Sequence, residues 1–336
     1  MMNYTLLEEL INIHSPSGYT EESIKYLKAY FDGLGFKTKV NTKGALKVLL
    51  SDKPVLSIAA HVDTLGAIVS GIKSDGTLTF SSLGGLSLSS AEGEYVDIVK
   101  MNGEKLTGTL LLNNPSSHAN KERETKSRNY ANMHVRIDEE VSTKKEVEDL
   151  GIRIGDFICF EPRYREYENG FIKSRFMDNK AGCFVLMELA RLVKESGKSF
   201  PVELFFSNYE EVGHGASTGY SNTIEELLVI DMGVVGDDCE GLETKCSICV
   251  KDSTGPYDFE MRKKLTELAE ANDIAHQLDV YPYYGSDGSA ALRAGNQFKV
   301  GLIGPGVAAS HGVERTHKKG IEATIDLCMA YMNDKF

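Results

Sequence analysis

The chain has 336 residues, of which 41% are hydrophobic and 26% charged, and these proportions are ordinary for a globular protein. Its length allows one large domain with an insertion, or two domains. The formal net charge of −12 argues against a nucleic-acid-binding protein, which needs a basic face, and no apolar run approaches the length of a membrane span.

The start of the chain and its cysteines both point to the cytoplasm. The first residues are polar and acidic, which is not typical of a signal or transit peptide. The six cysteines are scattered through apolar stretches, so we expect free thiols in a reducing compartment. Cys246 and Cys249 form a C-x-x-C pair within an expected strand, and because no second pair lies nearby we favour a structural role over a zinc or redox site.

The N-terminal part of the chain predicts two helices followed by strands. Apolar residues recur at helical spacing over 4–14, and a second helix over 20–35 begins with Thr20 as its cap and ends at glycine. The segment 38–50 indicates a β-hairpin, and the apolar run at 55–61 indicates a buried strand.

The pattern changes at about residue 70. Short β segments separated by glycine turns follow at 74–85, 94–114 and 151–164. A short helix is expected at 143–151, and the polar, charged segment 116–132 is expected to be a loop. We therefore predict a small β domain over 70–165, inserted into a discontinuous catalytic domain made of 1–69 and 166–336.

After the insert, helices and strands alternate. Helices are predicted at 179–197, 259–273, 287–295 and 321–334, and strands at 202–207, 226–231, 245–251, 276–283 and 298–304. This alternation predicts an α/β fold with a mixed, largely parallel sheet that has helices on both faces.

Polar residues stand where the predicted core elements end or begin. They are His61, Asp63, Asp178, Glu210, Glu211, Asp231 and His311. Open α/β sheets bind ligands beyond the carboxyl ends of their strands, so these residues are expected to meet there. Two imidazoles and several carboxylates, with no cysteine, suit zinc, cobalt or manganese, and a pair of ions about 3.5–4 Å apart would need about this many ligands.

Each of these residues also has a plainer explanation when taken alone. Asp178 could cap the helix that follows it, and Asp231 could open a turn. His311 could be an ordinary surface or core histidine, and Glu210-Glu211 could be an acidic loop in water. Only their combination, in step with the strand pattern, favours a metal site.

The spacing of neighbouring residues suggests different roles for them at such a site. Side chains two apart on an extended segment share a face, so Asp63 can orient the ring of His61 or polarise the site. Adjacent side chains point to opposite sides, so one of Glu210 and Glu211 can hold a metal while the other takes a proton from water.

With these motifs the chain resembles the co-catalytic metallo-aminopeptidases of the glutamyl-aminopeptidase, deblocking-aminopeptidase and tetrahedral (TET) type. The resemblance rests on "AAHVDTLGAIV", "GIRIGDFICFEP", "GFIKSRFMDNKAG", "SNYEEVGHGAS", "LLVIDMG" and "SHGVERTH", which span nearly the whole chain. It implies removal of N-terminal residues from peptides, on a phosphorylase/hydrolase-like α/β core with a β-barrel-like insert. Some relatives are labelled endoglucanases.

The resemblance also assigns roles. It implies two divalent ions per subunit, zinc or cobalt before manganese, held by His61, Asp178, Glu211, Asp231 and His311. His61 and Asp231 would hold one ion, Glu211 and His311 the other, with Asp178 as the bridge. Glu210 would be the general base and Asp63 would orient His61. The family often assembles through the insert into tetrahedral dodecamers, and a small β insert with free edge strands would favour a homo-oligomer.

The chain departs from the family's sequence pattern at two places. "YGSDGSA" replaces the family's Gly-Gly-Thr-Asp-Ala near the substrate pocket, and "NNPSSH" lacks the second proline of a Pro-Pro-His in the insert. Three other functions compete with the aminopeptidase hypothesis. A carboxypeptidase or amidohydrolase could use the same metal pair. A glycosidase could use Glu210 with a second carboxylate and would need neither histidine. The last alternative is a peptide-binding scaffold with a vestigial site.

Overall fold

The computed structural model describes residues 2–336 and divides the chain into two compact units. One unit combines the residues up to Thr64 with Arg163–Phe336, and the other is Leu65–Pro162. The insert therefore begins and ends a few residues earlier than its sequence texture indicates, because the strand β4 (Gly66–Ile72) already belongs to it. None of the described helices is long and apolar enough to cross a membrane.

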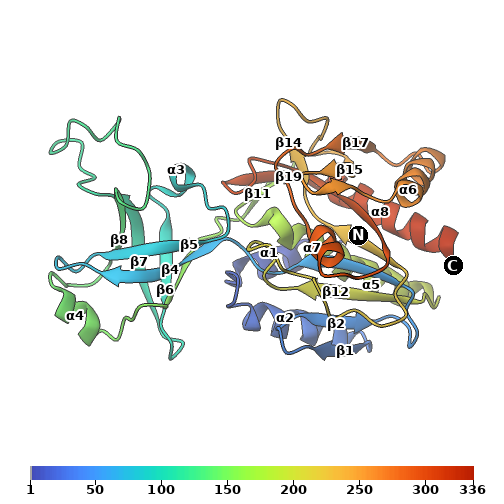
Figure 1. The fold of residues 1–336 in the computed structure, drawn as a ribbon, viewed down its shortest axis with the longest axis horizontal. Coiled ribbons are helices and arrows are strands. Elements are labelled where there is room, and N and C mark those ends of the chain that lie inside the picture. The colour runs from blue at the N-terminus through green and yellow to red at the C-terminus, as the bar shows by residue number, and fades with distance from the viewer. Residues whose placement is uncertain (1) are drawn as a thin grey trace. The chain divides into compact units, whose positions relative to one another are not determined.

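The larger unit is built on a mixed sheet (Figure 1). Its centre consists of parallel strands in the order β12 (Val202–Ser207), β3 (Leu56–His61), β13 (Glu226–Ile230) and β18 (Lys299–Ala308). The hairpin of β1 (Lys37–Val40) and β2 (Leu46–Leu49) extends one side in antiparallel fashion. Beyond β18 follow β19 (Glu314–His317), β11 (Phe171–Ser174) and β10 (Arg165–Glu166), again antiparallel.

Four further strands lie off this path. The strands β14 (Gly233–Val235) and β15 (Cys246–Asp252) pair with β18, and β15 in turn pairs with β16 (Gly255–Pro256) and β17 (His276–Val280). The mixed sheet confirms the predicted fold class, with parallel pairing concentrated at its centre, where the strands that precede the candidate residues lie side by side.

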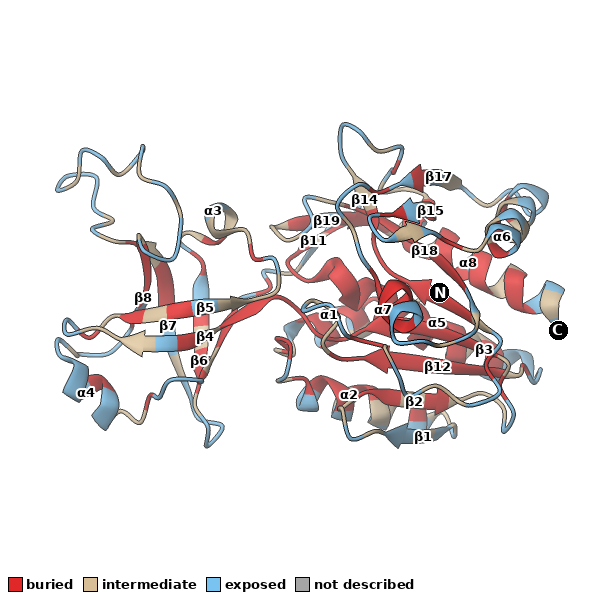
Figure 2. Ribbon diagram, viewed as in Figure 1, coloured by how far each residue is buried: buried red, intermediate tan, exposed pale blue. Residues whose placement is uncertain are grey.

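Apolar residues alternate along the central strands and fill two separate cores. Ile58 and Ala60 pack into one core with the helices α1 (Thr5–Asn12), α2 (Glu21–Gly33), α5 (Met177–Ser196), α6 (Phe259–Ala271) and α8 (Lys318–Lys335). Ala59 points to the opposite core, which contains Ala291 of α7 (Asp287–Arg293). Both faces of the strands are therefore buried, as Figure 2 shows, and the site can form only at their ends.

The smaller unit is a closed barrel. Its strands follow the order β4, β5 (Leu78–Leu83), β8 (Met133–Ile137), β7 (Lys105–Leu112), β6 (Tyr95–Val99) and β9 (Phe157–Phe160). Alternate residues such as Val69, Ile98 and Val135 fill its interior. The short helices α3 (Leu88–Ala91) and α4 (Lys144–Asp149) lie between strands, and residues 116–132 contain neither helix nor strand. Because every strand of a closed barrel is paired on both sides, the expectation of free edge strands in this insert is wrong.

Candidate metal centre

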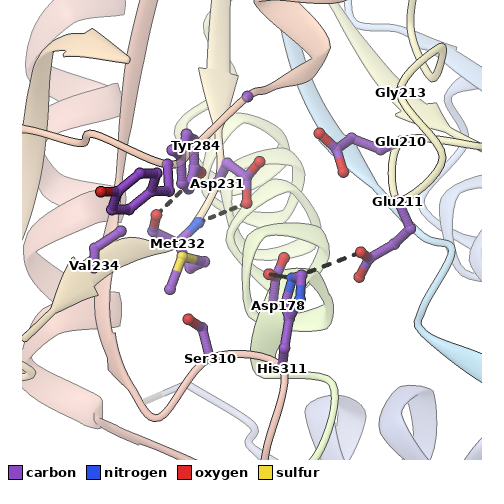
Figure 3. A pocket seen from close by; sticks show the side chains of 12 residues that line it. Asp178, Glu210, Glu211, Gly213, Asp231, Met232, Val234, Tyr284, Ser310 and His311 are labelled. Atoms are coloured by element: carbon purple, nitrogen blue, oxygen red, sulfur yellow. Dashed lines mark hydrogen bonds and ion pairs between the residues drawn. The ribbon is translucent and has the colours of Figure 1, made fainter. Parts of the chain in front are cut away.

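The candidate residues meet beyond the carboxyl ends of the central strands. His61 is the last residue of β3, Asp231 directly follows β13, and Glu210 and Glu211 lie in the loop after β12. Asp178 belongs to the first turn of α5, and His311 lies between β18 and β19. All of these residues except His61 line a cavity of about 430 Å³, into which Asp178, Asp231 and His311 project opposite Glu210 and Glu211 (Figure 3).

Asp178 stands at the centre of this cluster and faces both histidines. Its Oδ1 lies 3.0 Å from Nε2 of His61, and its Oδ2 lies 3.6 Å from Nε2 of His311. Asp178 therefore belongs to two groups of close ligand atoms, and within each group these atoms lie within 4.8 Å of one another. The first group adds His61 and Asp231, and the second adds Glu211 and His311. One carboxylate is thus placed to serve two cations.

The backbone around Asp178 turns its carboxylate away from the helix. Phe176 has a φ of 69°, and Asp178 and Asn179 have non-helical dihedral angles, with a cis peptide bond between them. No side chain caps the start of α5, so Asp178 is not the helix cap that it could have been from sequence alone. Asn179 ties this turn to the sheet, because its Nδ2 donates to the carbonyl oxygen of Ile230 at 2.8 Å.

The ring of His61 is held in one tautomer. Its Nδ1 lies 2.8 Å from the backbone carbonyl oxygen of Asp63, which can only accept, so Nδ1 carries a proton and Nε2 is the ring nitrogen that faces the cluster. The carboxylate of Asp63 lies 3.7 Å from the same nitrogen. The backbone of Asp63, rather than its side chain, makes the orienting contact that we expected.

The buried carboxylate of Asp63 instead holds the loop that follows β12. It accepts hydrogen bonds from the backbone N–H groups of Glu210 at 3.1 Å and Glu211 at 3.3 Å, and from Oγ of Ser17 at 2.5 Å. Asp63 is therefore a positioning residue for the two adjacent glutamates.

The two glutamates point in different directions. Oε2 of Glu210 lies 3.7 Å from Nε2 of His61, whereas Oε2 of Glu211 lies 3.7 Å from Nε2 of His311. The divergence was expected from an extended segment, but the structure has a turn here, with Tyr209 at a φ of 76°. Oε1 of Glu211 is buried and accepts no hydrogen bond from any residue that the structure describes. Such an atom costs free energy unless a cation or water binds it.

Two further acids support the cluster and were missed from sequence. Glu314 is buried in β19 and accepts hydrogen bonds from the N–H groups of Asp178 at 3.1 Å and His311 at 3.0 Å. Asp287 accepts from Oγ of Ser207 at 2.5 Å and from N–H of Ala216 at 2.7 Å. The sequence signal for Glu314 was its place three residues after His311, and for Asp287 its place in "YGSDGSA".

A close approach of the backbone keeps the glutamate loop in place. A Cβ atom added to Gly215 would lie 2.1 Å from Oδ1 of Asp287 and 2.8 Å from Cα of Glu210. Lys43 holds the same loop from outside, since its Nζ donates to the carbonyl oxygen of Gly215 at 2.7 Å. These close contacts explain why the second glycine of "GHGAS", Gly215, cannot carry a side chain.

The electrostatics of the cluster favour bound cations. Burial raises the pKa of Glu210 and Glu211 well above the ordinary value, and raises that of Asp231 to about 8. Neighbouring carboxylates raise all three further. Burial lowers the pKa of His61, but the carboxylates around it outweigh burial and raise that pKa well above its usual value.

These acids therefore retain protons, or require added positive charge, when they are packed so closely. Imidazole and carboxylate donors, a carboxylate shared by two ligand groups and an orphaned oxygen on Glu211 all fit divalent cations. Glu210 belongs to neither ligand group, which separates it from Glu211.

The chain is similar over nearly its whole length to known proteins. The family model described as M42 glutamyl aminopeptidase matches residues 41–327. The chain is 42% identical over 332 residues to "Putative aminopeptidase YhfE" of Bacillus subtilis, covering 97% of this chain and 96% of that protein.

Solved structures share the fold over nearly the whole chain. A TET aminopeptidase from a marine-sediment archaeon of the Thaumarchaeota has a TM-score of 0.89 at 23% identity, covering 98% of this chain and 95% of that one. A TET peptidase of Pyrococcus horikoshii, described as assembling into a tetrahedron or a large octahedral shell, has a TM-score of 0.85 at 24% identity and covers 98% of both chains. At these identities the likeness extends to the fold alone.

Proposed function

Because the chain belongs to the M42 glutamyl aminopeptidase family it is an aminopeptidase, and we propose that it removes N-terminal residues from peptides with two divalent metal ions and Glu210 as general base. The observation that carries the proposal is the position of Asp178, whose two carboxylate oxygens face two different histidines. A carboxylate at the junction of two ligand groups is the arrangement that a metal pair requires.

The proposed ligands follow the two groups. His61 and Asp231 would hold one ion, Glu211 and His311 would hold the other, and Asp178 would be shared by both. Imidazole and carboxylate ligands suit zinc and cobalt, and they also accept manganese. When bound, such a pair polarises the scissile carbonyl group and lowers the pKa of the attacking water.

Glu210 is the proposed proton carrier. Its carboxylate faces the cavity from the side opposite Asp231 (Figure 3), and Asp63 fixes its backbone through the N–H group. It takes a proton from the attacking water and returns it to the amine that leaves as the peptide bond breaks.

A matched set of blocked peptides separates the aminopeptidase from its rivals. We expect a tripeptide with a free N-terminus to be cut from that end, whether or not its C-terminus is amidated, because the ammonium group is part of the recognition. The N-acetylated tripeptide should be resistant. Loss of the C-terminal residue from the acetylated peptide would indicate the carboxypeptidase alternative. Hydrolysis of a cellulose substrate that persists after chelation would indicate the glycosidase alternative.

Glu314 supplies a prediction about the support of the ligands. In Glu314→Gln the amide can accept only through its oxygen, so one of the N–H groups of Asp178 and His311 loses its acceptor. We expect metal affinity to fall roughly 10- to 100-fold, as when other partners of metal ligands are removed. The measurement is metal binding by calorimetry, and Glu270→Gln on the exposed side of α6 is the control. Unchanged affinity in Glu314→Gln would contradict this role.

We also propose a homo-oligomer in which the barrel makes much of the contact. The support lies in exposed apolar side chains on this unit: Met101, Ile154 and Tyr95 expose 86%, 70% and 66% of their surface. We expect light scattering at micromolar concentration to give a multiple of the chain mass, with a tetrahedral dodecamer as the proposed assembly. Met101→Lys/Ile154→Lys should dissociate it, and a monomeric wild-type chain would refute the proposal.

The proposed place of action is the cytoplasm. All six cysteines are free, and five of them are buried. Free thiols are stable in a reducing compartment, and this supports the proposal.

A further inference from the structure

From the wall of the metal cavity we infer that the chain prefers a neutral, apolar side chain on the first residue of its substrate. The inference rests on the proposed function and names the substrate class for that site. It departs from the acidic preference that the description of the family implies.

The wall lies beside the candidate ligand Asp231. Met232, Val234 and Tyr284 line the cavity on one side, and Glu210 and Glu211 lie across from them (Figure 3). The N–H group of Met232 donates to Oδ1 of Asp231 at 2.7 Å, so the wall begins one residue after the ligand. A substrate with its reacting carbonyl group at the ligands therefore presents its first side chain to this surface.

The wall is held rigidly at its base and open at its mouth. The hydroxyl group of Tyr284 donates to the carbonyl oxygen of Met232 at 3.1 Å, and this bond fixes the ring against the segment that precedes β14. A Cβ atom added to Gly285 would meet nothing within 4 Å, so there is free space beside the tyrosine. Large apolar side chains can thus enter without displacing the wall.

Charge decides against an acidic first residue. No lysine or arginine is found among the described residues that line the cavity, whose charged groups are Asp178, Glu210, Glu211, Asp231 and His311. A substrate glutamate would place its carboxylate against Met232, Val234 and Tyr284, where no lysine or arginine of the described lining can pair with it. An apolar side chain instead gains the transfer free energy of the surface that it buries.

The first test compares aminoacyl-4-nitroanilides on the metal-loaded protein. We expect kcat/KM for leucine or phenylalanine to exceed that for glutamate roughly 10- to 100-fold, the range in which apolar pockets discriminate. A preference for glutamate would overturn the inference and leave the aminopeptidase proposal standing. A loaded protein that cleaves none of the free-amine substrates would instead refute the proposed function.

The second test places a charge in the wall. Val234 is partly exposed and lines the cavity, whereas Val235, the next residue of β14, does not line it and points to the other face of the strand. In Val234→Lys we expect the glutamate-to-leucine ratio of kcat/KM to rise at least about tenfold, because the substrate carboxylate gains a partner. Val235→Lys is the matched control and should leave this ratio unchanged.

A charge of the opposite sign keeps the test decisive. Val234→Asp should raise the lysine-to-glutamate ratio, even if Val234→Lys does not fold, and thermal melting identifies any variant that is unfolded. If neither the glutamate-to-leucine ratio nor the lysine-to-glutamate ratio of kcat/KM differs between wild type, Val234→Lys and Val234→Asp, the assignment of this wall to the first side chain is overturned.

Discussion

Glu210→Gln will lose nearly all turnover while both metal ions stay bound. The amide keeps the size of the side chain but cannot take a proton from the attacking water. Removal of a general base typically slows a reaction about 10²–10⁴-fold, and we expect the upper end because Glu210 is the only carboxylate among the described residues lining the cavity that belongs to neither ligand group. Substrate affinity should change little, since Asp63 holds the Glu210 backbone regardless of the side chain.

Glu211→Gln is the matched comparison, one residue away. Its carboxylate faces His311, and its Oε1 is buried without a partner among the described residues, so the amide should lower metal occupancy together with the rate. Elemental analysis beside steady-state rates distinguishes the two variants. If Glu210→Gln loses metal while Glu211→Gln stays loaded, their roles are exchanged. If both retain full activity, the pair is only an acidic loop.

Chelation should reduce peptide hydrolysis to background, and an added divalent metal should restore it. Burial and neighbouring carboxylates raise the pKa of Glu210, Glu211 and Asp231, so the metal-free site is also electrostatically strained. Ions that bind only the folded state stabilise it, by about 2.7 kcal/mol at a free concentration 100 times Kd. We therefore expect a lower melting temperature after chelation as well.

Circular dichroism provides the control for this experiment, because it shows whether the metal-free protein keeps its fold. Undiminished turnover in folded, exhaustively chelated protein would contradict a metal-dependent reaction.

The meeting of the site residues was predictable because the central strands are parallel. His61 and Ser207 are register partners at the ends of β3 and β12, and β13 ends on the other side of β3. Residues that follow such strands emerge at one edge of the sheet, whatever their separation in sequence. For this reason strand-end polarity located Glu210, Glu211 and Asp231 from sequence alone.

The orientation of these side chains was not predictable in the same way. It depends on single backbone angles, such as the φ of 76° at Tyr209 and the non-helical dihedrals of Asp178, and residue patterns do not encode them. The backbone contact of Asp63 to His61 has the same origin. Glu314 was missed because it binds only backbone N–H groups, and an acid in a short strand has no distinctive spacing.

Several short strands of the fold were not predicted from the sequence. β8, β11 and β19 have 4–5 residues each and lie next to polar loops, so alternation over so few positions was not distinctive. Closure of the barrel depends on pairing between β4 and β9, which are distant in sequence, and the local pattern could not show it.

The most direct test of the central claim is a metal titration of the metal-free chain in which bound zinc or cobalt and peptide turnover are measured together. Two ligand groups that share Asp178 predict two ions per chain at saturation, with full turnover only when both are bound. Asp178→Asn should bind fewer than two ions at the same concentration, because the shared carboxylate is lost. Saturation at one ion or none with full activity, or an Asp178→Asn chain that still binds two ions, would contradict the paired-metal account.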